Sequence, residues 1–147
     1  MRLVQWSVQS NHLHLLCEAK SVEALSRGMK GLGVRIAKRL NRFWGRRGRV
    51  VGDRFHAREL KTPREVRSAL VYVLQNVKKH GWKSLRKADP FSTGIGFEGW
   101  KPRLASKQPP QALPLTARPR SWLLTTGWKR LGLIGLNETP LARSPYR

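Results

Sequence analysis

The residues of this chain best suited to chemistry are two histidines and a tyrosine with an asparagine. His12 and His14 are two residues apart in a short apolar run. Alternate residues of a strand share a face, so both imidazoles can bind one metal ion. Tyr72 and Asn76 are four residues apart in a segment with helical periodicity, one turn apart on the same side. Either pair alone also fits ordinary polar or packed residues, but together they allow a metal site and a nucleophile to meet.

The composition is strongly basic. The 147 residues include 30 Lys or Arg and 8 Asp or Glu, a formal charge of +22 at pH 7. Such an excess opposes compaction unless a polyanion neutralises it, so nucleic acid is the expected partner. A basic surface that serves only solubility is a weaker alternative. A membrane-surface protein is another, and it would need a cationic amphipathic helix with few competing core elements.

Several other classes of protein are disfavoured by the sequence. The single cysteine, Cys17, leaves no internal disulfide and no cysteine-rich zinc site. The first eight residues lack the apolar core of a signal peptide, and no run approaches the length of a membrane span. We expect a cytoplasmic, nucleoid-associated protein with no membrane partner. The glycines of residues 94–99 have dinucleotide-site spacing but no flanking strand and helix, so no nucleotide cofactor is expected.

The elements that position the histidines are predicted to form a hairpin of residues 3–8 and 12–18. Its apolar faces are predicted to be those of Val4, Trp6 and Val8 in the first strand and of Leu13, Leu15 and Cys17 in the second. The histidines and Leu16 then lie on the opposite face. The alternation therefore predicts that His12 and His14 point away from the core.

A long basic helix is predicted from the N-cap Ser21 to about Trp44. Its apolar stripe recurs at steps of three and four residues, at Leu25, Met29, Leu32, Ile36, Leu40 and Phe43. The remaining surface and the following loop are basic, with no acidic residue from residue 24 to residue 52. A solvated helix face normally mixes both signs of charge. We therefore expect DNA phosphate contacts from Arg35, Lys38, Arg39, Arg42, Arg46, Arg47 and Arg49.

Residues 50–60 are predicted to be a third strand, with Arg54, His56 and Arg58 on one face. Thr62 to Glu65 then combine a capping box with proline in the first turn, which predicts a helix to about Lys79. The core stripe of this helix is predicted to be Val66, Leu70, Val73 and Val77. Tyr72 lies about 130° around the helix from that stripe, so we expect it outside the core.

Prolines make residues 83–120 resemble a linker, and residues 121–131 are predicted to form a short helix that docks on the rest. The predicted organisation is a catalytic domain of residues 1–82, a linker-like extension of residues 83–120, and a C-terminal helix and tail of residues 121–147.

Taken in order, these motifs resemble the single-tyrosine HUH transposases, in particular the insertion-sequence 200-like group that includes the REP-associated tyrosine transposases. The resemblance covers about residues 1–80, and residues 89–100 are similar to a segment that follows the domain in some members. It is carried by Asn11-His12-Leu13-His14-Leu15-Leu16, the basic helix, Gly52-Asp53-Arg54-Phe55-His56, Thr62-Pro63, and Tyr72-Val73-Leu74-Gln75-Asn76.

The resemblance implies that His12, His14 and Asn76 bind a divalent metal, Mg²⁺ or Mn²⁺. It implies that Tyr72 is the nucleophile that cleaves and rejoins single-stranded or hairpin DNA through a 5′-phosphotyrosine link, with no need for ATP. Tyr146, near the C-terminus, is the only other tyrosine. Arg54 and Arg58 would join the basic helix in holding phosphates. His56 is a candidate proton acceptor or, alternatively, a polar strand residue or a DNA contact.

The resemblance also implies an α+β, ferredoxin-like antiparallel sheet with two main helices, and a possible homodimer. Relatives carry a strand and a helix before the segment that begins at Arg2, so we expect an N-terminally truncated version of that fold with unpaired strand edges. An inactive relative that only binds nucleic acid, and a purely structural metal site, stay as alternatives. For Phe43, Trp44, Trp82 and Trp100, base stacking competes with core packing.

Overall fold

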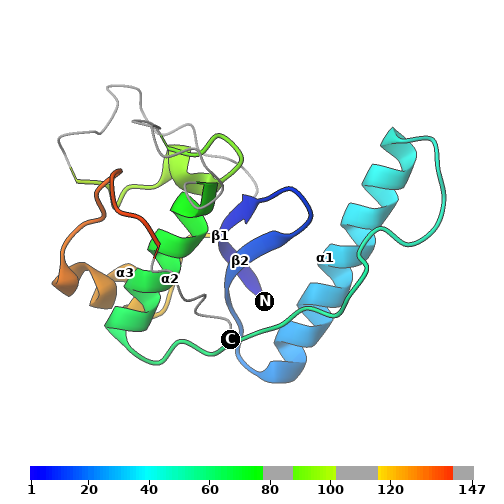
Figure 1. Ribbon diagram of the computed structural model, residues 1–147. Helices are drawn as coiled ribbons and strands as arrows, with labels where there is room; N and C mark the ends of the chain where they lie inside the picture. The colour runs from blue at the N-terminus through cyan, green and yellow to red at the C-terminus, as the bar shows by residue number, and fades with distance from the viewer. Residues whose placement is uncertain (78–87, 102–115, 141–147) are drawn as a thin grey trace. The chain divides into compact units, whose positions relative to one another are not determined.

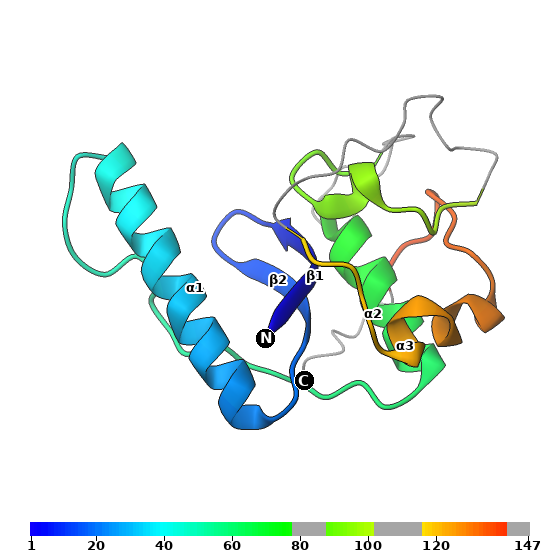
Figure 2. The same ribbon diagram turned by 180° about the vertical axis from the view of Figure 1, so that it is seen from behind.

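The computed structural model describes residues 1–77, 88–101 and 116–140, and these residues form an α+β fold (Figures 1 and 2). Two strands pair in an antiparallel sheet, and the longer helices precede the short helical turns. The elements are β1 (Arg2–Val8), β2 (Leu13–Glu18), α1 (Val22–Phe43), α2 (Pro63–Gln75), the 3-10 helix η2 (Thr93–Gly96), α3 (Trp122–Thr125) and the 3-10 helix η4 (Gly127–Leu131).

The contacts group these elements into two compact units. One unit contains residues 19–58, with α1 and the loop that follows it. The other contains the hairpin of β1 and β2, together with α2 and the described residues that follow α2. This grouping differs from the predicted segments 1–82, 83–120 and 121–147, because the described C-terminal residues belong to the same unit as the hairpin.

Both long helices begin where the sequence predicts. The Ser21 hydroxyl accepts a hydrogen bond from the Ala24 backbone N–H at 3.2 Å, and α1 ends with Trp44 as its C-cap. At α2, Thr62 and Glu65 form the reciprocal capping box, with Pro63 in the first turn. Helix α2 ends at Gln75, with Asn76 as its C-cap. The last two residues of the predicted helix, 78 and 79, lie outside the described residues.

Val4 of β1 is buried as predicted, but β2 packs on the face that the sequence did not predict. A β-bulge falls between Leu3 and Gln5 and changes which residues of β1 share a side. As a result Val4 and Ser7 are buried, while Val8 is 43% exposed. In β2 the buried residue is Leu16, and Leu13 is 41% exposed. The prediction that the face of His14 and Leu16 points away from the core is therefore wrong, because α2 packs against that face.

The predicted third strand, residues 50–60, is also wrong. These residues have no regular secondary structure. A strand needs a neighbour that supplies alternating backbone partners, and the described sheet contains only β1 and β2. Arg54, His56 and Arg58 therefore lie in an irregular, exposed segment.

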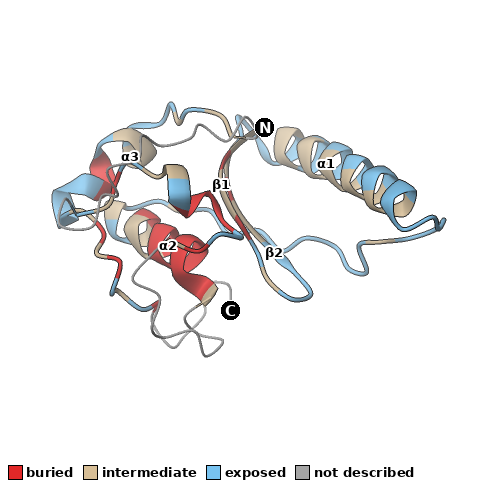
Figure 3. Cartoon of the chain, turned by 90° about the horizontal axis from the view of Figure 1, so that it is seen from above, coloured by how far each residue is buried: buried red, intermediate tan, exposed pale blue. Residues whose placement is uncertain are grey.

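Helix α2 is the centre of the core in its unit. Eight of its residues are buried, and they lie on all sides of the helix (Figure 3). The hairpin covers one side, whereas α3 and η4 cover another. The core cluster joins Leu16 of β2 to Leu70 and Leu74 of α2 and to Trp128 and Ile134 of the C-terminal residues. The second half of α2 is therefore enclosed, whereas Arg64, Glu65 and Arg67 make its first turns polar.

Residues 88–101, one of the two described parts of the predicted linker, pack against the outer edge of β1. The Val8 N–H donates to the Phe91 carbonyl at 2.8 Å, and Ser7 forms a bridge with Ser92. The Thr93 hydroxyl accepts from the Trp6 N–H at 3.1 Å. This edge of β1 is therefore covered at residues 6–8 rather than left for pairing with another strand.

Two carboxylates tie the C-terminal residues to this unit. The Glu18 carboxylate accepts hydrogen bonds from the backbone N–H groups of Arg120 and Ser121 at 2.8–3.0 Å, and it lies 3.5 Å from Arg2. Burial raises the pKa of Glu18, but these hydrogen bonds and the charge of Arg2 outweigh it and lower the pKa below 4.5. Glu138 pairs with Arg67 at 2.8 Å. The predicted docking of residues 121–131 therefore occurs, as two short helical segments.

Two further findings concern the single cysteine and the length of the helices. Burial raises the pKa of the Cys17 thiol to about 11, which makes it a poor nucleophile. Within residues 1–77, 88–101 and 116–140, none of the helices combines the length and the apolar character needed to span a bilayer.

Candidate functional site

The two histidines stand side by side at the start of β2. Their ring centroids are 4.8 Å apart and their planes meet at 84°. His12 is exposed and immediately precedes the strand, whereas His14 is within the strand and is half-buried. The two imidazoles are therefore in edge-to-face contact, and their shared binding of a metal ion stays a prediction.

A neighbouring side chain sets the tautomer of His12. The His12 Nδ1 lies 2.6 Å from the Asn11 Oδ1. An amide oxygen only accepts hydrogen bonds, so Nδ1 carries the proton and, in the neutral ring, Nε2 has the free lone pair. Metal-binding histidines are commonly oriented by such a partner on the second ring nitrogen. Asn11 orients His12 through this contact, a role that the sequence pattern did not predict.

Tyr72 contacts His14, one of the two paired histidines. The centroids of the His14 and Tyr72 rings are 4.8 Å apart, at an interplanar angle of 81°. Tyr72 is 8% exposed, so the prediction that it lies outside the core is wrong. Both corrections have one cause: α2 packs on the histidine face of the hairpin, which buries Tyr72 and brings it to His14.

Asn76 lies one turn beyond Tyr72 and is 1% exposed. Neither its Oδ1 nor its Nδ2 has a hydrogen-bond partner among the residues that the structure describes. A buried amide without partners costs about 1–3 kcal/mol, so such groups are rare unless they serve a ligand. Gln75 beside it has a different role, because its amide donates to the Gly135 carbonyl at 2.7 Å.

The side chains that the predicted divalent metal site requires are two imidazoles and one amide oxygen. Two imidazoles lie together, and a buried amide oxygen follows on the helix that carries Tyr72. No cluster of three or more His, Cys, Asp or Glu side chains occurs in the described residues. A metal here therefore depends on the Asn76 amide as third protein ligand, which suits Mg²⁺ or Mn²⁺ better than a softer metal.

The residues predicted to contact DNA phosphates all lie on the unit of residues 19–58, and all are exposed or partly exposed. That segment contains twelve Lys or Arg residues and two acidic residues. Helix α1 supplies four of the predicted residues and the segment after it supplies the rest. They are Arg35, Lys38, Arg39, Arg42, Arg46, Arg47, Arg49, Arg54 and Arg58.

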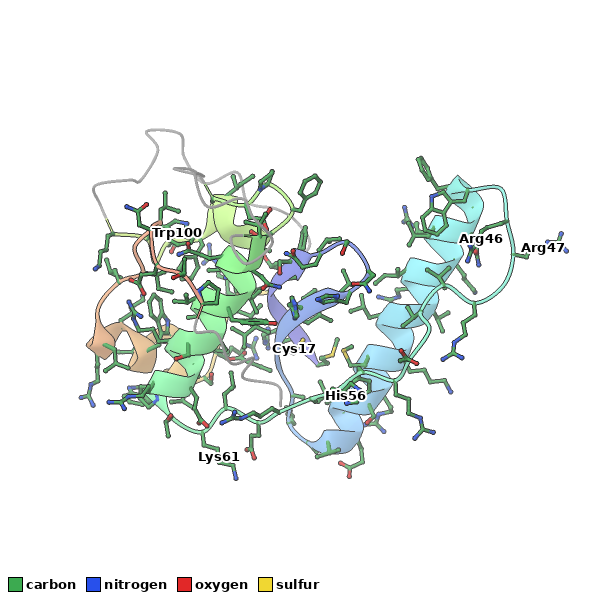
Figure 4. All side chains as sticks on the ribbon, in the orientation of Figure 1. Cys17, Arg46, Arg47, His56, Lys61 and Trp100 are labelled. Carbon is green, nitrogen blue, oxygen red and sulfur yellow. The ribbon has the colours of Figure 1, made fainter. Side chains whose placement is uncertain are left out.

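Two of these arginines, Arg46 and Arg49, also hold the loop that follows α1. Figure 4 labels Arg46 and its neighbour Arg47 in this loop. Arg46 donates from Nε to the Asn41 Oδ1 at 3.2 Å and from Nη2 to the Arg49 carbonyl at 2.9 Å. Arg49 donates from Nε to the Val51 carbonyl at 2.7 Å. The loop is therefore a built structure with cationic side chains on its surface.

The predicted base-stacking residues separate into two groups. Phe43 is 82% exposed and Trp44 is 50% exposed. Trp100, labelled in Figure 4, instead donates its indole N–H to the Gly94 carbonyl at 2.8 Å and packs edge-on against Phe97, so it has a structural role. Trp82 and Tyr146 lie outside the described residues. His56 belongs to the unit of residues 19–58 and is exposed.

Comparisons of the chain with protein-family models, with curated proteins and with solved structures found no match.

Proposed function

We propose that this protein is a transposase that cleaves and rejoins single-stranded or hairpin DNA, with Tyr72 as the nucleophile. The family we infer is that of the single-tyrosine HUH transposases. The observation that supports it best is the contact between Tyr72 and His14, which joins the helix with the nucleophile to the paired histidines. Two features about 60 residues apart in sequence meet in one place, as strand cleavage at a metal site requires.

In the proposed reaction the Tyr72 oxygen attacks the phosphorus of a phosphodiester. The Tyr72 O–P bond forms while the P–O3′ bond breaks, the phenolic proton leaves the tyrosine, and the 3′ oxygen is released as a hydroxyl. Because the phosphotyrosine bond retains the energy of the phosphodiester, a second 3′ hydroxyl can reverse the step and join strands without ATP.

The metal in this proposal is Mg²⁺ or Mn²⁺, held by His12, His14 and Asn76. When bound, such an ion polarises a phosphoryl oxygen and neutralises the charge that develops during attack. Asn11 would keep His12 in the tautomer that presents Nε2. The rigid enclosure of α2 would hold Tyr72 against His14, which limits the reorganisation needed for attack.

The fold and assembly are proposed with the function. The antiparallel hairpin with α2 packed on one face is compatible with part of a ferredoxin-like sheet, and we propose that fold. We further propose a homodimer and a cytoplasmic location at the nucleoid, where the substrate is found.

A covalent adduct tests the proposal. The protein is incubated with a 5′-labelled and, separately, a 3′-labelled DNA hairpin with single-stranded flanks, in Mn²⁺, and analysed on a denaturing gel. We expect a shifted protein band with the 3′-labelled DNA only. The fragment attached to Tyr72 through its 5′ end carries the original 3′ end. The matched control is Tyr72→Phe, which should bind the hairpin with affinity within about twofold of wild type but form no adduct.

Chelation separates the proposed site from a structural metal site. We expect chelator to abolish the adduct while leaving the far-UV circular dichroism spectrum unchanged, since α2 is held by apolar packing. An adduct that persists in Tyr72→Phe, or the lack of any adduct in wild type with Mn²⁺, would contradict strand cleavage.

A nucleic-acid-binding protein without cleavage activity is the second candidate. It is favoured by one observation: residues 19–58 carry twelve Lys or Arg residues against two acidic ones, and this compact unit contains neither the histidine pair nor Tyr72. Binding of DNA with no adduct under any metal would support this function instead.

A further inference from the structure

The end of α1 exposes two aromatic rings for which the structure shows no packing role. We call residues 41–51 the α1 tip. Phe43 is 82% exposed and Trp44 is 50% exposed. Large aromatic side chains left in water at adjacent positions usually mark a binding surface. Because neither ring is buried, both can be changed without opening a cavity.

The α1 tip is an ordered structure. The Asn41 side chain donates to the Gly48 carbonyl at 2.7 Å and accepts from Arg46, while the Arg46 backbone N–H donates to the Asn41 carbonyl at 2.9 Å. Gly45 and Gly48 have φ values of 62° and 105°, which let the chain reverse directly after the helix. The two rings are therefore presented on a loop that is already formed, so little ordering is needed when a ligand binds.

The charge around the rings specifies the kind of ligand. The Arg46 guanidinium lies over the Trp44 ring, 5.3 Å from its centroid, and Arg42, Arg47 and Arg49 are close in sequence. No acidic residue occurs between residues 24 and 52. Exposed flat rings set among arginines match a polyanion that also offers flat, unpaired faces.

We propose that the α1 tip binds single-stranded DNA by stacking unpaired bases on Phe43 and Trp44 while the neighbouring arginines hold the phosphates. Duplex DNA is disfavoured because its bases are already stacked on each other and offer no face to an exposed ring. The choice of DNA depends on the proposed function, whereas the stacking depends only on the α1 tip.

The experiment compares two strands with the same phosphates. One is a single strand of about 12 nucleotides with all bases, a length within the range that single-strand binding sites cover. The other has abasic residues at every position, and affinities are measured by fluorescence anisotropy at one salt concentration. We expect wild type to bind the strand with bases at least about tenfold more tightly, since each stacked base contributes about tenfold. In Phe43→Ala/Trp44→Ala this ratio should fall to below about threefold, with the affinity for the abasic strand changed by less than about twofold.

Matched variants define the interaction. Phe91→Ala removes a ring that is 64% exposed on the other unit, and it should leave the ratio unchanged. Phe43→Leu/Trp44→Leu keeps apolar side chains but removes the flat rings. Its ratio of the two affinities should fall to below about threefold, as in the alanine variant. A ratio preserved in the leucine variant, or an equal loss of affinity for both strands in the alanine variant, would overturn base stacking. So would a ratio near one in wild type, or a change of sedimentation coefficient in the alanine variant, which would assign the rings to self-association.

This test is independent of strand cleavage. Tyr72→Phe should lose the adduct and keep the wild-type ratio. If wild type forms no adduct but the alanine variant loses the ratio, base stacking stands and the transposase proposal fails. If wild type forms the adduct but the alanine variant keeps the wild-type ratio of affinities, the transposase proposal stands and base stacking fails.

Discussion

Helices α1 and α2 have the same kind of sequence signals and opposite surroundings. Each has a hydroxyl N-cap, an acidic residue in its first turn and an apolar stripe. Yet none of the 22 residues of α1 is buried, while eight of the 13 residues of α2 are. The local signals determine that a helix forms, and tertiary packing decides whether its side chains become a core or a surface.

The difference matches what each helix is proposed to do. A nucleophile must be held in one place, and Tyr72 is on the enclosed helix against His14. Charges that hold DNA phosphates must stay accessible, and the basic residues are on the exposed helix. In the proposed function, one compact unit positions the nucleophile and the other supplies the phosphate contacts.

Core truncation gives the largest expected difference between the helices. Leu70 is 1% exposed in α2, so Leu70→Ala should lower the free energy of unfolding by about 2–5 kcal/mol. Leu32 is on the partly exposed stripe of α1, and Leu32→Ala should cost less than about 1.5 kcal/mol. Urea denaturation followed by circular dichroism measures both. Equal losses would mean that α1 is enclosed in solution as fully as α2.

Removal of positive charge from the unit of residues 19–58 should weaken DNA binding, whereas the same removal from the other unit should not. Replacing Arg35, Lys38, Arg39 and Arg42 by glutamine should weaken binding of single-stranded DNA about 100-fold and reduce the salt slope by about 0.7 for each phosphate that is no longer neutralised. The control removes the same charge from the other unit, at Arg118, Arg120, Lys129 and Arg130. If both variants weaken binding equally, net charge alone drives association and the basic surface of α1 has no special role.

Asn76 offers a test in which stability and function change in opposite directions. Asn76→Leu removes a buried amide without partners among the described residues, so the metal-free protein should become more stable by about 1–3 kcal/mol. The same change removes the proposed oxygen ligand, so the rise in melting temperature caused by Mn²⁺ should disappear, along with the adduct. A destabilised variant that still responds to Mn²⁺ would show that Asn76 has a structural role.

The smallest expected effect concerns the attachment of the C-terminal residues through Glu18. The folded protein lowers the pKa of Glu18 below 4.5, so its contribution to stability is present above that pH and is lost as the pH falls through the folded value. Glu18→Gln should therefore destabilise by about 1 kcal/mol at neutral pH, and this difference should shrink steadily as the pH falls below 4.5. Urea midpoints of both proteins measured over this pH range test it. A difference that does not depend on pH would assign the effect to packing rather than to charge.

Much of the local structure could be predicted from the sequence. The start of α1 at Ser21, the capping box of Thr62 and Glu65 and the two strands of the hairpin all depend on neighbours close in the chain, and all are observed. The spacing of His12 from His14 also indicated that their rings would meet. The accumulation of charge on residues 19–58 is visible in the sequence without any structure.

The errors all concern contacts between distant residues. Alternation in β2 left two faces of similar hydrophobicity, with leucines on both, and the bulge in β1 cannot be read from its sequence. The third strand had a suitable composition but lacks a pairing partner in the described sheet. The role of Asn11 in orienting His12 was missed, although an asparagine directly before a histidine in a turn is the signal that could have indicated it.

The sequence by itself determined which side chains are available and how they are spaced, because helix caps, strand alternation and charge density act over a few residues. Only the tertiary structure decided that α2 covers the histidine face of the hairpin and so places Tyr72 against His14. That choice depends on how much apolar surface the hairpin, α2 and the C-terminal residues bury together, and no local pattern contains that sum.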